Sequence, residues 1–175
     1  MPKLEHTSVP PWTVRDVGAR PPEPDRTGGS YLLVGVGSAG RQAVTEWAAA
    51  LGGFAVRALV GDDAAAVATD LSAALAETRV GARLRIAGPV GACLTLRGVA
   101  VSAGVEDDEL YVSPTGTGPV DIWCVHCAVT TAAEAVVTDV VPCAGCGRNL
   151  LVYHHVSRRT GRFLGFQVDA EEVAS

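Results

Sequence analysis

Two closely spaced cysteine pairs constrain this chain more than any other feature of its 175 residues. Cys124 and Cys127 form the first Cys-x-x-Cys pair, Cys143 and Cys146 form the second, and fifteen residues lie between the pairs. This spacing is typical of a tetrahedral metal site in which each pair supplies two thiolates. Four thiolates leave no coordination position for water, so we expect a structural Zn²⁺ ion and not a catalytic one.

Other chemistry for these thiols stays open. The stretch "PCAGCG" also resembles one knuckle of a rubredoxin, and thiolates suit iron as well as zinc, so spacing alone does not separate the two metals. A redox-active dithiol would normally be a single pair at the start of a helix, which does not fit two pairs. We expect His126 to lie outside the ligand set and Cys93 to be a small buried apolar residue.

Strand and helix patterns alternate ahead of the cysteine pairs. The predicted strands span residues 31–36, 54–60, 82–88 and 109–113. The predicted helices span residues 40–53, 62–78 and 89–105, the second with acidic residues in its first turn and the third the most ambiguous of the set. Alternation of this kind predicts a parallel sheet covered by helices.

A glycine-rich turn follows the first predicted strand. Gly35, Gly37 and Gly40 in "GVGSAG" match the G-x-G-x-x-G pattern of dinucleotide sites, and Asp62 and Asp63 lie about where a ribose-binding acid is expected. The pattern has two interpretations, a cofactor site for a nicotinamide nucleotide or a β/α turn that holds no ligand. We favour the second, because about 80 residues must supply the whole sheet.

The residues at the two ends of the chain differ from this β/α region in composition. Residues 1–30 contain six of the ten prolines and no helical or strand period, which predicts a disordered tail or an extended arm with Trp12 as an anchor on a partner. Residues 149–173 contain two β-rich runs on either side of "SRRTG", which predicts a β-hairpin that turns there and completes a zinc-ribbon sheet. We therefore divide the chain into an arm (1–30), a β/α domain (31–119) and a zinc-ribbon-like domain (120–175).

Side chains of this predicted hairpin leave further questions. Strict alternation sends His154 and His155 to opposite faces of the strand, so we do not expect them to share a metal ion. Arg158, Arg159 and Arg162 form a basic cluster at the tip, which could dock an acidic group or could be a solvated turn.

Charge and hydropathy exclude several classes of function. The formal net charge of -5 and the pI near 5.3 disfavour nucleic acid and anionic membranes as partners. There is no apolar signal-peptide core near the start and no run of about 18 apolar residues, so we expect a cytoplasmic protein that spans no membrane. We find no recognisable catalytic triad, carboxylate pair or phosphate-binding loop.

Residues 122–172 resemble a known family. The second cysteine pair, followed in order by "YHHVSRR", "LGF" and "DAE", is similar to the C-terminal region of the small DmmA-type subunit of bacterial dimethylamine monooxygenase. The resemblance implies one component of a multi-subunit oxygenase that removes a methyl group from a secondary amine. It also implies that electrons come from a reduced nicotinamide through flavin and an iron–sulfur centre. The haem, the flavin and the iron–sulfur centre would lie on partner subunits.

The β/α region is similar to the nicotinamide domain of ferredoxin reductases, with two departures. The turn "GVGSAG" lacks the proline of that family, and Ser113 and Pro114 stand where a reductase has Cys-Gly before its proline. The resemblance thus implies a degenerate reductase-like domain that is retained for assembly.

The expected fold is α/β, with a small reductase-like parallel β/α domain followed by a C-terminal four-cysteine zinc-ribbon-like β domain. The expected function is that of a non-catalytic zinc-binding subunit. An electron-transfer or NAD(P)H-binding component is the alternative, and a regulatory zinc ribbon that contacts nucleic acid ranks third.

Overall fold

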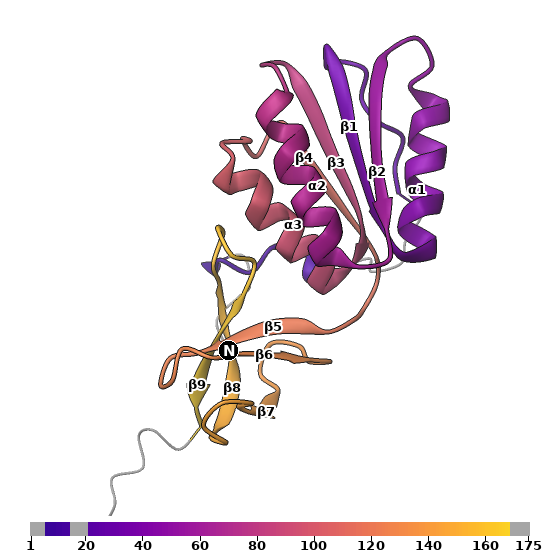
Figure 1. Cartoon of the computed structure of the whole chain (residues 1–175). Helices are drawn as coiled ribbons and strands as arrows, with labels where there is room; N and C mark the ends of the chain where they lie inside the picture. Colours follow the sequence, from indigo (N-terminus) through magenta and orange to yellow (C-terminus); the bar gives the residue numbers. More distant parts are fainter. Residues whose placement is uncertain (1–5, 15–20, 169–175) are drawn as a thin grey trace, which may run out of the picture.

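The computed structural model describes residues 6–14 and 21–168, and it folds the chain around two β-sheets (Figure 1). The first sheet has four parallel strands in the order β2-β1-β3-β4. These strands are β1 (Ser30–Val36), β2 (Ala55–Gly61), β3 (Ala82–Pro89) and β4 (Leu110–Gly116). The parallel sheet expected from the alternating pattern is confirmed.

Three helices cover the two faces of this sheet. They are α1 (Gly37–Ala50), α2 (Ala64–Glu77) and α3 (Val90–Ser102). Strand β1 is apolar without interruption because both of its faces are buried. Tyr31 and Leu33 lie in the core under α1, whereas Leu32 and Val34 lie in the core under α2 and α3. None of the α-helices in the described part exceeds 14 residues, and none could cross a membrane.

The helix boundaries correct two details of the sequence analysis. Helix α1 begins at Gly37, three residues before the predicted start, so the glycine-rich turn forms its first turn. Asp63 is not inside the first turn of α2 but is its N-cap, where its carboxylate accepts hydrogen bonds from the amides of Ala65 (3.1 Å) and Ala66 (3.2 Å). The ambiguous stretch 89–105 does form a helix, α3.

The second sheet has five strands in the order β6-β5-β9-β8-β7. These strands are β5 (Val120–Cys124), β6 (Thr130–Ala133), β7 (Val140–Pro142), β8 (Asn149–Val156) and β9 (Phe163–Gln167). Strands β8 and β9 form the predicted antiparallel hairpin, and β9 pairs in parallel with β5. All four paired cysteines belong to this sheet and its turns, so the C-terminal four-cysteine β region is confirmed.

The two sheets share one apolar cluster where α3 meets the second sheet. Val90 and Leu94 of α3 pack together with Val120 and Phe163 of the second sheet. Figure 1 shows the tip of the β8–β9 hairpin reaching up to α3. A Cβ atom on Gly161 would overlap the carbonyl group of Leu94, so a glycine is needed where the tip meets the helix.

The described residues near the N-terminus lie along both sheets. Trp12, in the short 3₁₀ helix Pro11–Thr13, packs against the core of the second sheet and against the core under α2 and α3. The Ser8 hydroxyl accepts a hydrogen bond from the Val156 amide at 2.9 Å. On the other side of the first sheet, the Pro22 carbonyl accepts hydrogen bonds from Trp47 Nε1 (3.1 Å) and Arg85 Nη2 (2.9 Å).

Candidate metal centre

The four paired cysteines converge at one end of the second sheet. Their Sγ atoms all lie within 4.8 Å of one another. The sulfur atoms of Cys124 and Cys146 are 3.9 Å apart, and those of Cys127 and Cys143 are 3.5 Å apart. Thiolates 2.3 Å from a tetrahedral zinc ion would be separated by roughly 3.8 Å, so this donor set fits the ion.

Two turns of nearly identical geometry bring the sulfurs together. In the first knuckle (124–129), the Cys124 amide donates to the Val129 carbonyl at 3.0 Å and the Ala128 amide donates to the Cys124 carbonyl at 2.9 Å. In the second knuckle (143–148), the same two bonds recur from the Cys143 amide to the Arg148 carbonyl (2.8 Å) and from the Gly147 amide to the Cys143 carbonyl (3.0 Å). The pairs of cysteines are therefore presented by one repeated backbone motif.

Both knuckles turn through a residue with positive φ. Gly147 has a φ of 70°, and Ala128, at the equivalent position, has a φ of 60°. An alanine in this region is strained by roughly 1–2 kcal/mol, so the surrounding contacts must hold it there. Gly145 is constrained by space, because a Cβ there would approach Val129 Cγ2 to 2.7 Å. It is needed for close packing of the two knuckles.

Backbone amides point at the sulfurs and favour the thiolate form. The amides of Cys146 and Gly145 donate to the Cys143 thiol, and together with the neighbouring thiols they lower the pKa of Cys143 to about 6. At Cys127 the Val129 amide also favours the thiolate. Desolvation and the neighbouring thiols outweigh it and raise the pKa of Cys127 to about 12. Four thiolates this close repel one another, so full ionisation needs a bound cation.

The four paired cysteines form a cage of sulfur atoms that includes no other thiol and no imidazole among the described residues. His126 is exposed and is not part of the four-sulfur group. Cys93 is fully buried in α3, where its thiol donates to the Gly88 carbonyl at 3.4 Å and desolvation raises its pKa to about 12. The expectation that Cys93 is a small buried residue is confirmed. His155 is exposed, with its Nδ1 atom 3.0 Å from the Ser8 hydroxyl.

The glycine-rich turn serves close packing at two of its three positions. A Cβ on Gly35 would lie 2.6 Å from the Gly40 carbonyl oxygen, and a Cβ on Gly40 would lie 2.6 Å from the Ala87 carbonyl oxygen. Gly37 has a φ of 74° and open space beside it. The approach of α1 to β1 and β3 therefore explains two of these glycines without a ligand.

The acids that follow β2 are also engaged. Asp62 pairs with Arg41 at 2.8 Å, and Asp63 caps α2. In a nucleotide site one of these carboxylates would have to be available for the ribose. The nicotinamide site suggested by the glycine pattern stays a prediction.

The predicted basic cluster at the hairpin tip is divided among different contacts. Arg158 pairs with Asp107 at 2.7 Å, and Arg162 lies 4.0 Å from Asp121. Arg97 of α3 shares the Asp107 carboxylate at 3.2 Å. Arg97 and Asp107 were not predicted from the sequence, although Arg97 is the only charged residue between positions 89 and 105, which marks it as unusual.

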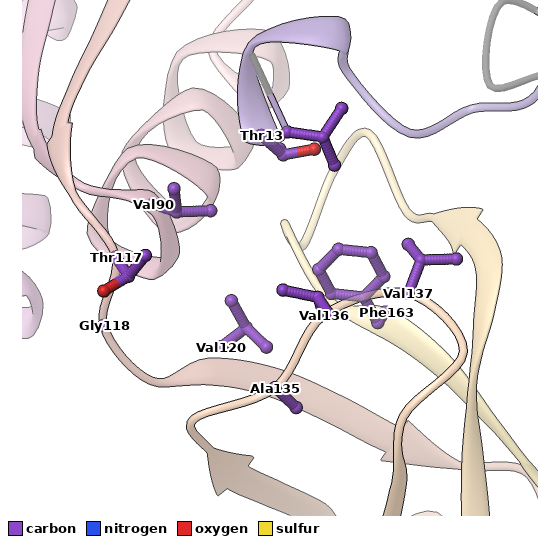
Figure 2. A pocket seen from close by; sticks show the side chains of 10 residues that line it. Thr13, Val90, Thr117, Gly118, Val120, Ala135, Val136, Val137 and Phe163 are labelled. Carbon is purple, nitrogen blue, oxygen red and sulfur yellow. The ribbon is translucent and has the colours of Figure 1, made fainter. Parts of the chain in front are cut away.

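The junction between the sheets also has an apolar pocket (Figure 2). Val90 of α3, Val120 of β5 and Phe163 of β9 line its inner wall. Val14 and Val136, both about half exposed, lie at its edge. The pocket's lining lacks charged groups, so it offers no acid, base or metal ligand for a reaction.

Comparison with known proteins identifies relatives of the chain. The family model described as "Dimethylamine monooxygenase subunit DmmA-like, C-terminal domain" matches residues 121–166, which contain all four cage cysteines. The chain is 35% identical over 145 residues, 81% of each protein, to the "Heme-dependent oxidative N-demethylase delta subunit" of Ectopseudomonas mendocina (strain ymp). No solved structure matches the chain. The chain belongs to the family of DmmA-like subunits.

Proposed function

We propose that this chain is a non-catalytic, zinc-binding subunit of a multi-subunit haem-dependent monooxygenase that oxidatively demethylates dimethylamine, and that it contributes to assembly of that enzyme. The closed cage of four sulfurs carries the proposal, because its donor set fills a tetrahedral ion and leaves no position for substrate or water. The name of the delta-subunit relative supports a place in an N-demethylase of several subunits.

Zinc bound by the four cysteines would stabilise the fold of the second sheet. It would fix the two knuckles against each other and neutralise thiolates that repel one another. The ligands would be Cys124, Cys127, Cys143 and Cys146. Because β5 and β8 begin or end at these knuckles, the ion would also hold the strands that carry the hairpin to α3.

The redox groups of the enzyme would lie elsewhere. We expect the haem on one partner subunit, and the flavin and iron–sulfur centre that carry electrons from a reduced nicotinamide on a reductase partner. The partners of this chain would then be those subunits, with no role for nucleic acid or membrane. The cytoplasm suits the site, since its reducing conditions keep thiols free for metal binding.

Metal analysis of the purified full-length chain tests the first part. We expect one zinc per chain and a colourless protein. Red protein that contains iron and shows a one-electron couple would instead support an electron-transfer component, because a four-sulfur cage also suits iron. A titration with NADH that gave micromolar binding would support the nicotinamide alternative.

Assembly is tested with a matched pair of cysteine variants. A tagged wild-type chain should co-purify with the other demethylase subunits from its native host. Cys143→Ser removes one ligand and should lower both zinc content and co-purification about tenfold or more, whereas Cys93→Ala, outside the cage, should keep both. If Cys143→Ser stays folded and assembled while turnover collapses, the cage has a chemical role and the proposal is wrong.

A further inference from the structure

A groove of about 440 Å³ runs beside β4 at the edge of the parallel sheet. One wall is the N-terminal segment from Thr7 to Trp12, and the other is formed by Leu110, Tyr111 and Val112 of β4. Arg97, Asp107 and Arg158 also line the groove. Its volume falls within the range of ligand-binding sites, about 300–1,000 Å³.

Among the described residues, no further strand bonds to the outer edge of β4 along this groove, although the turn Pro11–Thr13 packs near that strand. Within the described part of the chain, β4 is paired only with β3. The Leu84 amide bonds to the Glu109 carbonyl at 2.8 Å, and in a parallel ladder alternate residues bond to the same neighbour. Leu110 and Val112 therefore direct their amide and carbonyl groups outward, into the groove.

Pro114 limits how far such a pairing could extend. Pro114 lies two residues after Val112, so its backbone groups also face away from β3, but its nitrogen has no hydrogen to donate. The available edge is therefore the first half of β4, which is the half that lines the groove.

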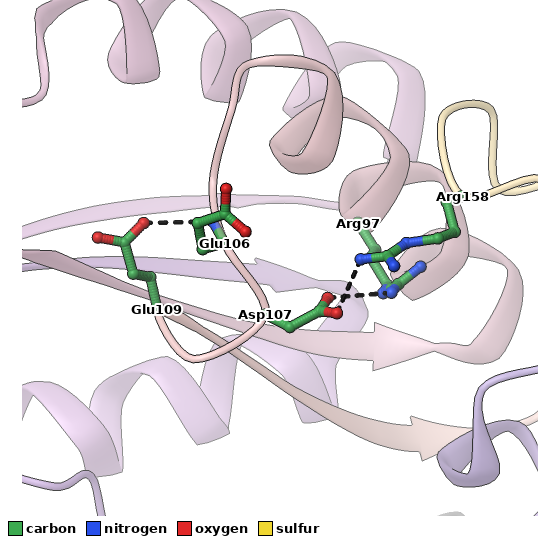
Figure 3. A network of polar contacts seen from close by, with 5 residues as sticks. All are labelled: Arg97, Glu106, Asp107, Glu109 and Arg158. Atoms are coloured by element: carbon green, nitrogen blue, oxygen red, sulfur yellow. Dashed lines mark hydrogen bonds and ion pairs between the residues drawn. The ribbon is translucent and has the colours of Figure 1, made fainter.

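Two arginines at the groove converge on a single carboxylate (Figure 3). Arg97 Nη2 lies 3.2 Å from Asp107 Oδ1, and Arg158 Nη2 lies 2.7 Å from Asp107 Oδ2. The Arg97 side chain is only 14% exposed, so burial strengthens its attraction for an anion. Figure 3 shows Glu106 and Glu109 on the far side of the same loop, away from the arginines. The charged side chains that line the groove are thus two guanidinium groups and one carboxylate, so positive charge predominates.

We propose that this groove binds an extended, acidic segment of another demethylase subunit, which adds a strand to the free edge of β4 and places a carboxylate on Arg97 and Arg158. The inference rests on the proposed function, which supplies the other subunit. Main-chain bonds to Leu110 and Val112 provide affinity, and the arginines select an acidic sequence by charge complementarity. Asp107 then competes with the incoming carboxylate.

The test uses synthetic 12-residue peptides that cover the sequences of the co-purified subunits, titrated against the full-length zinc-loaded chain by fluorescence anisotropy. At least one acidic peptide should bind. Arg158→Glu should weaken that binding about tenfold or more. The matched control is Arg159→Glu, the same change one residue along the tip and outside the groove lining, which should bind within about twofold of wild type.

Two more variants separate this role from a purely structural one. Asp107→Asn removes the competing carboxylate and should tighten peptide binding severalfold, whereas a structural link between the sheets would leave binding unchanged or weaker. Val112→Pro removes an outward amide, as Pro114 already does, and should abolish binding while zinc content stays the same.

Several outcomes would overturn the inference. They are equal effects of Arg158→Glu and Arg159→Glu, binding of no peptide by a chain that does assemble with its partners, and a wild-type chain that dimerises through this edge. Failure of the wild-type chain to co-purify with any demethylase subunit would instead count against the proposed function.

Discussion

At the scale of single residues, Arg85 lies in surroundings unusual for a cation. It is only 3% exposed, and its guanidinium lies 4.6 Å from the Trp47 ring centroid and 4.2 Å from that of Tyr111. Desolvation lowers the pKa of Arg85, and its Nε atom has no hydrogen-bond partner among the described residues. The ring faces and the Pro22 carbonyl compensate for part of the lost hydration, which ties residues near Pro22 to the sheet.

The stacked geometry predicts a graded response to substitution. Arg85→Ala leaves a cavity between two rings and should lower the free energy of unfolding by about 2–3 kcal/mol. Arg85→Met keeps most of the stacked volume and should cost about 1 kcal/mol, the size of a cation–π interaction. Urea denaturation of both variants measures the difference. Equal losses would show that volume between the rings is not what stabilises this site.

Cys93 predicts a difference in thiol reactivity. Its pKa is raised to about 12 by burial, so at pH 8 the thiol stays neutral and inaccessible. Because removal of zinc should loosen the two knuckles, iodoacetamide should modify the four cage cysteines of chelator-treated protein, although Cys124 is as buried as Cys93 in the folded sheet. Cys93, in the core of the first sheet, should be spared and should react only in denaturant. Mass spectrometry of the digested protein checks this. Native modification of Cys93 would contradict the packing of α3.

At the scale of elements, the glycines of the β1–α1 turn decide how closely a helix approaches the sheet. Gly40 faces the Ala87 carbonyl of β3 across the helix–sheet contact, so α1 lies against β1 and β3 at a distance that no larger residue allows. The acidic cap of α2 acts locally instead, since the Asp63 carboxylate accepts hydrogen bonds from two amides of its own helix. One turn thus depends on tertiary packing and the other on its own sequence.

Two alanine substitutions separate close packing from backbone conformation. Gly40→Ala forces α1 away from β3 and should lower the free energy of unfolding by about 2–3 kcal/mol. Gly37→Ala meets no neighbouring atom and should cost roughly 1–2 kcal/mol through its positive φ alone. Thermal denaturation followed by circular dichroism compares them. A larger loss for Gly37→Ala would argue that the turn has another role.

At the scale of the whole molecule, the second sheet is joined to the first through α3 and stabilised by its own cage. Val90 and Leu94 belong to the same apolar cluster as the cage residues Cys124 and Cys143. Loss of the metal would therefore act on the shared cluster as well as on the two knuckles. The hairpin tip, with Arg158 held on Asp107, lies at the far end of that connection.

Zinc removal should loosen the second sheet before the first. We expect chelation at pH 7.5 to lower the melting temperature by about 10 °C or more, because the binding free energy of a structural zinc is folding free energy. Hydrogen exchange should rise first in β5–β9, while β1 and β3 stay protected. Uniform exchange across both sheets would show that the cage governs the fold as a single unit.

Zinc retention should also depend on pH in a stated direction. Folding lowers the pKa of Cys143 from 9.0 to about 6, so in metal-free protein the stability linked to this thiolate is complete above pH 9 and is lost as pH falls to 6. Protons and zinc compete for the same sulfurs, so acidification should release the ion. A colorimetric chelator assay from pH 8 to pH 5 should show increasing release. Faster release at the alkaline end would contradict this assignment.

Local pattern predicted much of this architecture. Apolar runs such as 31–36 and 82–88 indicated buried parallel strands, and the turn "SRRTG" indicated the β8–β9 hairpin, because these signals depend on neighbours in the chain. The cysteine spacing likewise predicted a four-sulfur group. The pairing of β5 with β9 and the contact between the hairpin tip and α3 were not predicted, since no periodicity encodes which distant segments meet.

By itself, the sequence determined the elements of the first sheet, the β8–β9 hairpin and the donor set, which is four thiols at a spacing typical of a shared metal centre. Only the tertiary structure decided where charges meet. Arg158 pairs with Asp107, 51 positions away, because the hairpin tip packs on α3, and Arg85 lies between rings from α1 and β4. Such contacts depend on the packing of whole layers, and packing is a property of the folded chain that no short stretch contains.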